Sequence, residues 1–361
     1  MNSSTRVGVG GVLRTVCSVV CASRFSGIRV RVAISGVLLF HAATCLSADM
    51  EITPFRTVNQ SPLVQIFGLP AESSAVITPA GHSTFSLTQD VASEYTVNQT
   101  SREQIILDGE SYRWTLAARY GISDRFEAGI EIPYVLYGGG FLDDFIIDWH
   151  NAFSLPQGGR ESAPRNRLNY SYSKDGVQKL AMNHAGSGIG DIVLSGGMKL
   201  YDAGDAGSRD RVALRTSLKL PSGASGSLRG SGSTDVSLSL CGSMNNFTEW
   251  GSLGVYGSAG GMVMTRGDVL SDQQKRLVGF GTLGLGWGPA EWISFKFQLN
   301  GHTAFYRNSS LTELSDNSLM LVVGGALKLP GDYLLDIGVS EDVAVATAPD
   351  VAFHLGVRKQ F

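Results

Sequence analysis

Alternation of apolar and polar residues with a period of two dominates the chain after residue 82. The longest run is 292–306, where one face is apolar and the other carries Ser294, Lys296, Gln298, Asn300 and His302. A period of two predicts a β-strand, and soluble strands average only about 5–6 residues. A tilted strand needs about 9–11 residues to cross a bilayer. The run is therefore typical of a membrane-spanning strand.

The same pattern predicts twelve strands, at 83–95, 103–120, 125–137, 188–202, 210–221, 232–246, 250–265, 276–288, 291–306, 317–329, 333–342 and 350–361. Short and long connections alternate along this series, as the periplasmic turns and outer loops of outer-membrane barrels do. We predict an all-β fold, a transmembrane antiparallel up-and-down β-barrel of about 12 strands, with 10 to 14 as the range. An unpaired strand edge is not tolerated in hydrocarbon, so the first strand must pair with the last. A soluble barrel or sandwich is the alternative.

Two local features refine this prediction. The apolar positions of 103–120 change parity at Asp108-Gly109, which predicts a bulge or a hairpin turn there. Aromatic residues gather near both ends of the strands, where amphipathic rings prefer the membrane–water interface. The expected inner girdle is Tyr201, Phe247, Trp250, Trp287, Trp292 and Tyr333, and the expected outer girdle is Tyr95, Tyr137, Phe305 and Tyr306.

Residues 1–48 have the features of a secretory signal peptide. Arg24, Arg29 and Arg31 precede an apolar run, 32–43, that is too short to span a bilayer comfortably. A single N-terminal anchor helix and a lipoprotein cysteine at Cys45 are the alternatives. The following segment, 49–82, is rich in proline and predicts an irregular periplasmic piece that tucks into the barrel mouth as a plug.

Composition and charge narrow the class of protein. Only 17% of the 361 residues are charged, and 45 are glycine. Removal of the five arginines of 1–48 leaves 24 of the 29 basic residues against 32 acidic ones, a net charge of −8. That balance argues against nucleic acid as a partner. Cys241 is the single cysteine left of four, so the mature chain has no intrachain disulfide.

The polar face of the strands supplies the candidate functional residues. These lumen-lining candidates are Glu127, Glu131, Arg215, Lys219, Lys296, Gln298, His302, Asp336, His354 and Arg358. Charges of opposite sign inside a barrel either pair into a rigid polar core or line an aqueous path for a small solute. Barrels of about 8 strands are filled by side chains and those of 16–18 are open. Twelve strands leave both possibilities open.

The connection 138–187 is predicted to be a long outer loop containing a short helix. Phe141, Phe145 and Trp149 fall on one face of that helix. The helix either folds into the barrel mouth as a constriction or lies on the outer leaflet. Basic residues after it would meet lipopolysaccharide phosphates, namely Arg160, Arg165, Arg167 and Lys174.

No convincing catalytic signature is present. Asp143, Asp144 and His150 lie in one predicted loop helix, whereas outer-membrane proteases carry such residues on strands. His302 has no serine placed beside it as a lipase would need. The six histidines show no metal-ligand spacing. We expect no enzyme, no metal and no cofactor.

Several stretches resemble a family of uncharacterised Gram-negative proteins, the domain of unknown function family 3187. They are Asn59-Gln60-Ser61-Pro62-Leu63, Phe67-Gly68-Leu69-Pro70, Leu107 to Arg113, Tyr120 to Glu127, and Gly188-Ile189-Gly190-Asp191. The resemblance covers about 55–361. It implies a bacterial envelope protein of the outer membrane, and it carries no known activity from which site residues could be transferred.

These patterns together predict an outer-membrane barrel, 83–361, that is a porin-like passive channel for an unidentified small solute. The alternative is a non-transporting barrel that acts as an anchor or binding scaffold through its outer loop, and a lipid-modifying enzyme is less favoured. The expected partners are outer-membrane lipids, lipopolysaccharide and the barrel-insertion machinery, which would recognise the last strand ending in Phe361.

Overall fold

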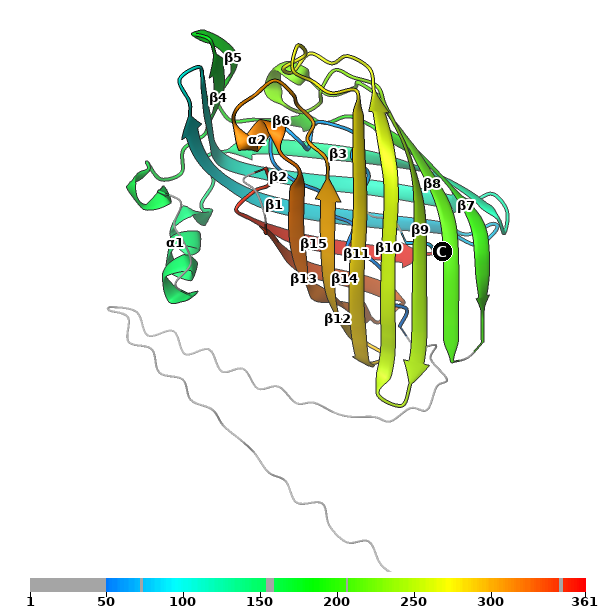
Figure 1. Ribbon diagram of the computed structural model, residues 1–361. Helices are drawn as coiled ribbons and strands as arrows, with labels where there is room; N and C mark the ends of the chain where they lie inside the picture. The colour runs from blue at the N-terminus through cyan, green and yellow to red at the C-terminus, as the bar shows by residue number, and fades with distance from the viewer. Residues whose placement is uncertain (1–49, 72–73, 154–158, 206, 344–346) are drawn as a thin grey trace, which may run out of the picture. The chain divides into compact units, whose positions relative to one another are not determined.

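A computed structural model describes residues 50–361 except 72–73, 154–158, 206 and 344–346 (Figure 1). These residues belong to one compact unit, 47–361. The predicted signal peptide, 1–48, lies outside the described residues. Twelve strands form the barrel: β1 Ser83–Gln99, β2 Glu103–Gly121, β3 Phe126–Gly138, β7 Val193–Gly204, β8 Ser208–Lys219, β9 Asp235–Thr248, β10 Gly251–Met264, β11 Leu277–Ala290, β12 Ile293–His302, β13 Ser318–Leu329, β14 Tyr333–Asp342 and β15 Val351–Gln360.

Each barrel strand pairs antiparallel with its neighbours in the chain, and β1 pairs with β15 to close the barrel. Thr84 lies opposite Gln360 at one end of that seam, and Ser93 lies opposite Val351 at the other. No edge of the barrel sheet is left open, which satisfies the backbone groups of the first and last strands. The predicted fold class and the twelve strands are confirmed.

The two faces of the wall differ as the period-two pattern predicts. Phe295, Phe297 and Leu285 point outward and are about half exposed, whereas Lys296 and Gln298 point inward and are buried. The outward faces form an apolar belt that fits the hydrocarbon of a bilayer. Trp250, Trp292 and Tyr333 remain exposed beside the short turns, where the inner girdle was expected.

The outer end of the barrel inverts this pattern. β2 continues through Asp108-Gly109 in unbroken register with β1, so neither a bulge nor a hairpin turn is present there. The parity changes because Ile105 and Leu107 are buried inside, whereas Leu116 faces outward from the lower part of the same strand.

Three of the four residues expected in the outer girdle do not lie there, for the same reason, whereas Tyr95 is partly exposed. Tyr137, Phe305 and Tyr306 are buried in the interior cluster. β12 also ends at His302 rather than at 306, because the chain turns inward there and Ala304 to Tyr306 are buried. Beyond the apolar belt, at the long-loop end, the outer surface of the barrel faces water. The apolar side chains of this part are therefore buried in the interior.

The predicted outer loop contains regular structure. It holds the helix α1 Leu142–Phe153, the short 3₁₀-helix η1 Arg160–Ser162, and the strands β4 Asn169–Lys174, β5 Val177–Met182 and β6 Gly186–Ile189. β4 pairs with the outer end of β2, and β6 pairs with β3. Two further short elements are η2 Ser225–Ser227 and α2 Thr312–Ser315. None of the helices in the described residues is long and apolar enough to cross a membrane.

Candidate functional site

The interior of the barrel is occupied by residues 50–71 and 74–78, which we call the lumen segment. Its first limb rises from the short-turn end of the barrel toward the long loops. The backbone N–H of Ile52 donates to Asn245 Oδ1 at 3.0 Å, and that of Phe55 donates to Gln298 Oε1 at 2.8 Å. Higher up, Asn59 Nδ2 lies 3.0 Å from His302 Nε2. Polar wall side chains therefore bind the segment step by step.

The tip of the segment, residues 61–69, lies at the long-loop end, and the second limb descends again. Tyr306 donates its hydroxyl to Leu63 O at the tip, at 2.9 Å. On the way down, Arg215 Nη2 donates to Ser74 O and Val76 O at 2.7 Å. Thr78 N then donates to Glu127 Oε2 at 2.6 Å, and the chain enters β1. The segment thus crosses the interior twice.

Glycine on the inner face makes room for the first limb. A Cβ placed on Gly254 would lie 2.4 Å from Ile52 Cβ, and one on Gly286 would lie 2.6 Å from Ile52 Cγ2. Any side chain at either position would displace Ile52. Nearby, Lys296 Nζ lies 3.9 Å from the centre of the Phe55 ring and donates to Thr53 O at 3.0 Å. The wall is shaped to hold this segment.

The ten candidate residues predicted for the lumen all face the interior, and most of them hold the segment. Besides those described, Glu131 pairs with Arg56, Lys219 donates to Ile66 O, and Arg358 donates to Thr53 Oγ1. Asp336 accepts from Lys296 at 2.5 Å, and His354 Nδ1 lies 2.7 Å from Asp90 Oδ1. In this structure much of the polar inner wall is therefore in contact with the lumen segment.

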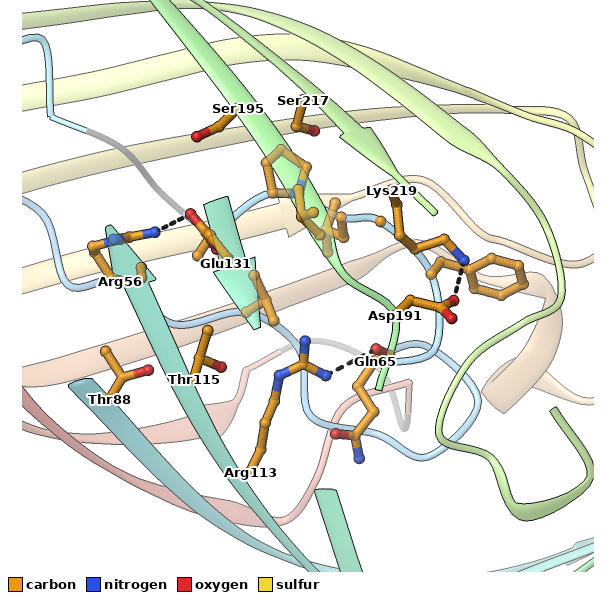
Figure 2. A pocket seen from close by; sticks show the side chains of 18 of the residues that line it. Arg56, Gln65, Thr88, Arg113, Thr115, Glu131, Asp191, Ser195, Ser217 and Lys219 are labelled. Atoms are coloured by element: carbon orange, nitrogen blue, oxygen red, sulfur yellow. Dashed lines mark hydrogen bonds and ion pairs between the residues drawn. The ribbon is translucent and has the colours of Figure 1, made fainter. Parts of the chain in front are cut away.

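A central cavity remains between the segment and the wall strands β1, β2, β3, β7 and β8, with about 80 Å³ open to the centres of water-sized molecules (Figure 2). Charged and hydroxyl side chains dominate its lining. The charged lining residues are Arg56, Asp90, Arg113, Arg119, Glu131, Asp191, Arg215, Lys219 and Arg229.

A second cavity, the mouth cavity, opens at the short-turn end and has about 360 Å³ open to the centres of water-sized molecules. It is lined by residues of the lumen segment such as Met50 and Thr78 and by wall residues such as Tyr333 and Arg358. Arg119 lines both cavities. The two spaces therefore adjoin each other at one arginine.

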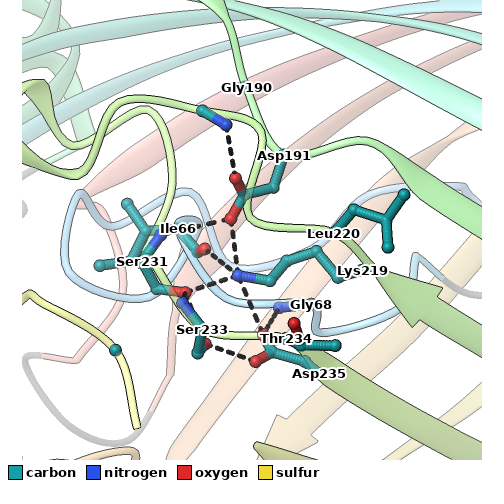
Figure 3. Close-up of polar contacts among 12 residues, drawn as sticks. Ile66, Gly68, Gly190, Asp191, Lys219, Leu220, Ser231, Ser233, Thr234 and Asp235 are labelled. Carbon is teal, nitrogen blue, oxygen red and sulfur yellow. Dashed lines mark hydrogen bonds and ion pairs between the residues drawn. The ribbon is translucent and has the colours of Figure 1, made fainter. Parts of the chain in front are cut away.

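A compact ionic network, which we call the outer lock, holds the tip of the segment (Figure 3). Lys219 Nζ lies 2.6 Å from Asp191 Oδ2 and 3.2 Å from Asp235 Oδ2, and it donates to Ile66 O at 3.2 Å. Gly68 N donates to Asp235 Oδ2 at 2.7 Å. All three charged side chains are almost fully buried. Two wall carboxylates and one wall ammonium thus clamp residues 66–68.

Apolar packing closes the barrel beyond the outer lock. Leu63, Val64, Ile66 and Phe67 of the tip belong to the largest buried cluster, together with residues of the wall and outer loops. The Phe67 ring stacks on Phe305 with centroids 4.8 Å apart. Water and ions are excluded from such a cluster, so the outer end is shut while the mouth cavity lies at the other end.

The outer loops are joined above this cluster by Glu103, at the far end of β2 beyond the apolar belt. Its carboxylate accepts from Tyr172 at 2.6 Å and from Ser310 N and Oγ at 2.6 Å, and it lies 3.1 Å from Lys174 Nζ. Burial would raise the pKa of Glu103, but these hydrogen bonds outweigh burial and lower the pKa from 4.5 to about 2.

This lowered pKa predicts an acid-resistant loop contact. A carboxyl with a depressed pKa contributes full stability above its unfolded value of 4.5 and loses that contribution as the pH falls through about 2. We expect pepsin to cleave the 307–316 loop slowly near pH 4 and much faster near pH 2. In Glu103→Gln, which cannot ionise at this site, the cleavage rate should not show this step. An equal step in both proteins would contradict the assignment.

The predicted loop helix lies outside the barrel. Leu142 and Ile146 of α1 pack against Val351, and Phe145 packs edge to face on Phe353, which points outward from β15. Glu110 accepts from the backbone N–H of Phe141 and Leu142 and so caps the start of the helix. Of the predicted face, Phe141, Phe145 and Trp149 stay about half exposed. The helix does not constrict the lumen.

The basic residues after α1 all pair with carboxylates. Arg160 contacts Asp143 and Asp350, Arg165 contacts Asp144, Arg167 contacts Asp108, and Lys174 contacts Glu103. Binding of lipopolysaccharide phosphates by these residues would have to compete with the pairs. Across residues 50–361 as described, no three His, Cys, Asp or Glu side chains are grouped so as to hold a metal ion.

Comparison with known families settles the membership of the chain. The model of a family described as "Protein of unknown function (DUF3187)" matches residues 32–361. The chain belongs to this family. The DUF3187 match includes the lumen segment and all twelve barrel strands, so one family model spans both parts of the site. No curated protein matches the sequence.

Solved structures share the DUF3187 barrel at low sequence identity. An outer membrane channel from Pseudomonas putida F1 is 14% identical with a TM-score of 0.51, and the match covers 80% of this chain and 99% of that one. LpxR from Salmonella typhimurium is 9% identical with a TM-score of 0.39, covering 76% and 99%. The translocator domain of the autotransporter NalP from Neisseria meningitidis is 12% identical with a TM-score of 0.37, covering 78% and 89%. The first likeness shows the fold of outer-membrane barrels.

Several residues of the site in this DUF3187 protein could not be identified from the sequence. Arg113 and Arg119 lie on the strand whose parity shift hides which face is inward. Arg56 lies outside the predicted strands, and Asp191 lies in the break between β6 and β7, which the predicted strand 188–202 did not contain. Asp235 begins β9, and its alternation with the outward Val236 and Leu238 together with its charge opposite Lys219 could have found it.

Proposed function

We propose that this protein is an outer-membrane channel for a small solute whose passage is controlled by the lumen segment. The observation that carries the proposal is the position of that segment: it fills the interior, leaves the mouth and central cavities adjoining each other, and closes the outer end with its tip. Movement of the tip alone would connect the central cavity to the exterior.

The bonding of the tip supports this movement. The tip is held by side-chain contacts such as those of Tyr306, Lys219 and Asp235, and its residues belong to none of the barrel strands. Its displacement therefore breaks no ladder of the wall. Loop segments that lie outside the regular scaffold are the parts that close and open sites in many proteins.

A disulfide between the tip and the wall tests the proposal. A Cβ placed on Gly68 would lie 3.0 Å from Asp235 Cβ and 2.9 Å from Lys219 Cβ, so a small outward shift of the tip relieves the second contact and brings the first into the range of about 3.5–4.5 Å found in disulfides. We expect the oxidised Gly68→Cys/Asp235→Cys protein, with Cys241→Ser to remove the native thiol, to be silent in a planar bilayer. Reduction should restore brief openings, because only the covalent tie is removed.

Each preparation serves as its own control, since the oxidised and reduced forms share one sequence. The Cys241→Ser protein without the pair should open equally with and without reductant. If the fully oxidised pair conducts as well as the reduced one, the tip is not the gate. If neither form nor the unmodified protein conducts, the channel proposal fails.

The second candidate is a non-transporting barrel that presents its outer surface for binding. It is favoured by the half-exposed aromatic side chains of α1, Phe145 and Trp149, and by the closed lumen. We propose the outer-membrane lipids as neighbours of this helix and the barrel-insertion machinery as a partner of β15. We propose no catalytic residues for this protein.

A further inference from the structure

The charges that line the central cavity do not balance. The arginines Arg56, Arg119 and Arg215 lie at or near the carboxylates of Glu127 and Glu131. Lys219 is paired in the outer lock, and Asp90 lies against His354. The cavity therefore contains a network of paired charges that uses up its own acidic groups.

Two lining arginines form no ion pair among the described residues. Arg229 donates to Ser187 O and to Ser227 Oγ instead, and the other is Arg113. It projects from β2 into the cavity, and its Nη1 donates to Gln65 O at 3.2 Å (Figure 2). No carboxylate among the described residues lies within 4.0 Å of this guanidinium. Asp90, Glu131 and Asp191 act on this guanidinium only from beyond ion-pair distance. A partly buried cation without a paired carboxylate attracts an anion from solution.

The surroundings of Arg113 suit an oxyanion. A guanidinium has five N–H donors in a planar fork that matches a carboxylate or a phosphate, and Arg113 has one such contact to protein. The hydroxyl-bearing residues Thr88, Thr115, Ser195 and Ser217 line the same cavity. The space open to the centres of water-sized molecules is about 80 Å³, room for several waters at about 10–15 Å³ each and so for a small oxyanion.

We propose that the central cavity binds the carboxylate or phosphate group of a small solute and that Arg113 contacts the oxyanion. The solute enters from the mouth cavity past Arg119, which lines both spaces. This inference rests on the channel proposed above, because it names the class of solute that the channel carries. Cations are excluded by the same excess of positive charge.

Calorimetric titration of the refolded chain, residues 49–361, with benzoate and with inorganic phosphate tests the site at constant ionic strength. We expect at least one of the two anions to bind. Arg113→Gln should weaken that binding at least about tenfold, because a charge-assisted hydrogen bond is lost. The affinity of Arg113→Lys should lie between those of the unchanged protein and of Arg113→Gln, since lysine keeps the charge and lacks the planar fork. Preference for benzoate or for phosphate assigns the solute class.

Arg266→Gln is the matched control. It removes one arginine from the exposed loop between β10 and β11, far from the cavity lining, and should leave the affinity unchanged. Equal affinities for Arg113→Gln and the unchanged protein, or no binding of either anion up to about 10 mM, would overturn the site.

Binding is measured on the closed protein, so it does not depend on conductance. If the protein binds the anion through Arg113 but never conducts, the anion site is supported and the channel proposal fails. If the protein conducts but binds neither anion, the channel proposal is supported and the anion site is overturned.

Discussion

Deletion of residues 50–70 should raise the single-channel conductance of the refolded barrel at least about tenfold, because the twelve-stranded wall encloses this segment in addition to its own side chains and a wider lumen conducts better. The segment now occupies the lumen and seals its outer end with Leu63, Val64, Ile66 and Phe67. Planar-bilayer recording of the deletion variant beside the full mature chain measures the change.

The barrel itself should survive this deletion. Its closing seam between β1 and β15 and all other strand ladders lie outside residues 50–70. Wall groups that now bind the segment, such as Lys296 and Gln298, would be hydrated in an open lumen instead of buried without partners. Retention of heat-modifiable mobility on a gel would show that the barrel is folded.

Deletion of α1, 142–153, is the matched control, because that helix packs on the outward side of β15. It removes a comparable apolar segment and should leave the conductance unchanged. A folded 50–70 deletion that stays as silent as the full chain would mean that side chains of the wall close the lumen, and the solute path would have to be abandoned.

The wall of the barrel was predictable because lipid on one side and a polar interior on the other impose a period of two. Phe295 and Phe297 alternate with Lys296 and Gln298 for that reason, and the twelve strands follow from such runs. The prediction failed where the lipid ends. At Leu107 and at Phe305 the apolar face turns inward, and no local pattern marks the height of the membrane surface.

The site was predictable only in part. The inward charges of the strands follow from alternation, and each candidate does face the interior. Their partners do not follow, because the lumen segment has no periodicity and its position depends on wall residues more than 100 positions away, as Ile52 depends on Asn245. Arg113 was hidden by the parity shift of its own strand.

The outer lock contains one ammonium for two carboxylates, which makes Lys219 its most sensitive member. The side chains of Asp191 and Asp235 are at most 5% exposed, and both point at Lys219 Nζ. Gly223 N and Gly68 N also donate to these carboxylates, each at 2.7 Å. Without the ammonium, two buried negative charges would face each other across the tip.

Lys219→Met should lower the free energy of unfolding by about 3–5 kcal/mol, the usual cost of leaving a buried charge without its partner. The same repulsion should be relieved when the tip moves away and water enters, so the open probability in a planar bilayer should rise as well. Thermal unfolding and single-channel recording of one preparation measure the two effects.

Two variants separate the charge from the shape of the side chain at this position. Lys219→Arg keeps the positive charge and should stay near the unchanged protein in both measurements. Lys219→Met/Asp191→Asn removes one charge of each sign and should recover part of the lost stability, since Asp235 then keeps Gly68 N as a donor. A Lys219→Met protein that melts and opens like the unchanged chain would show that apolar packing of Phe67 and Ile66 alone holds the tip. Hydrophobic contacts would then keep the gate closed. Its open probability would change with substitutions at Phe67 and would not change with substitutions of the charged residues.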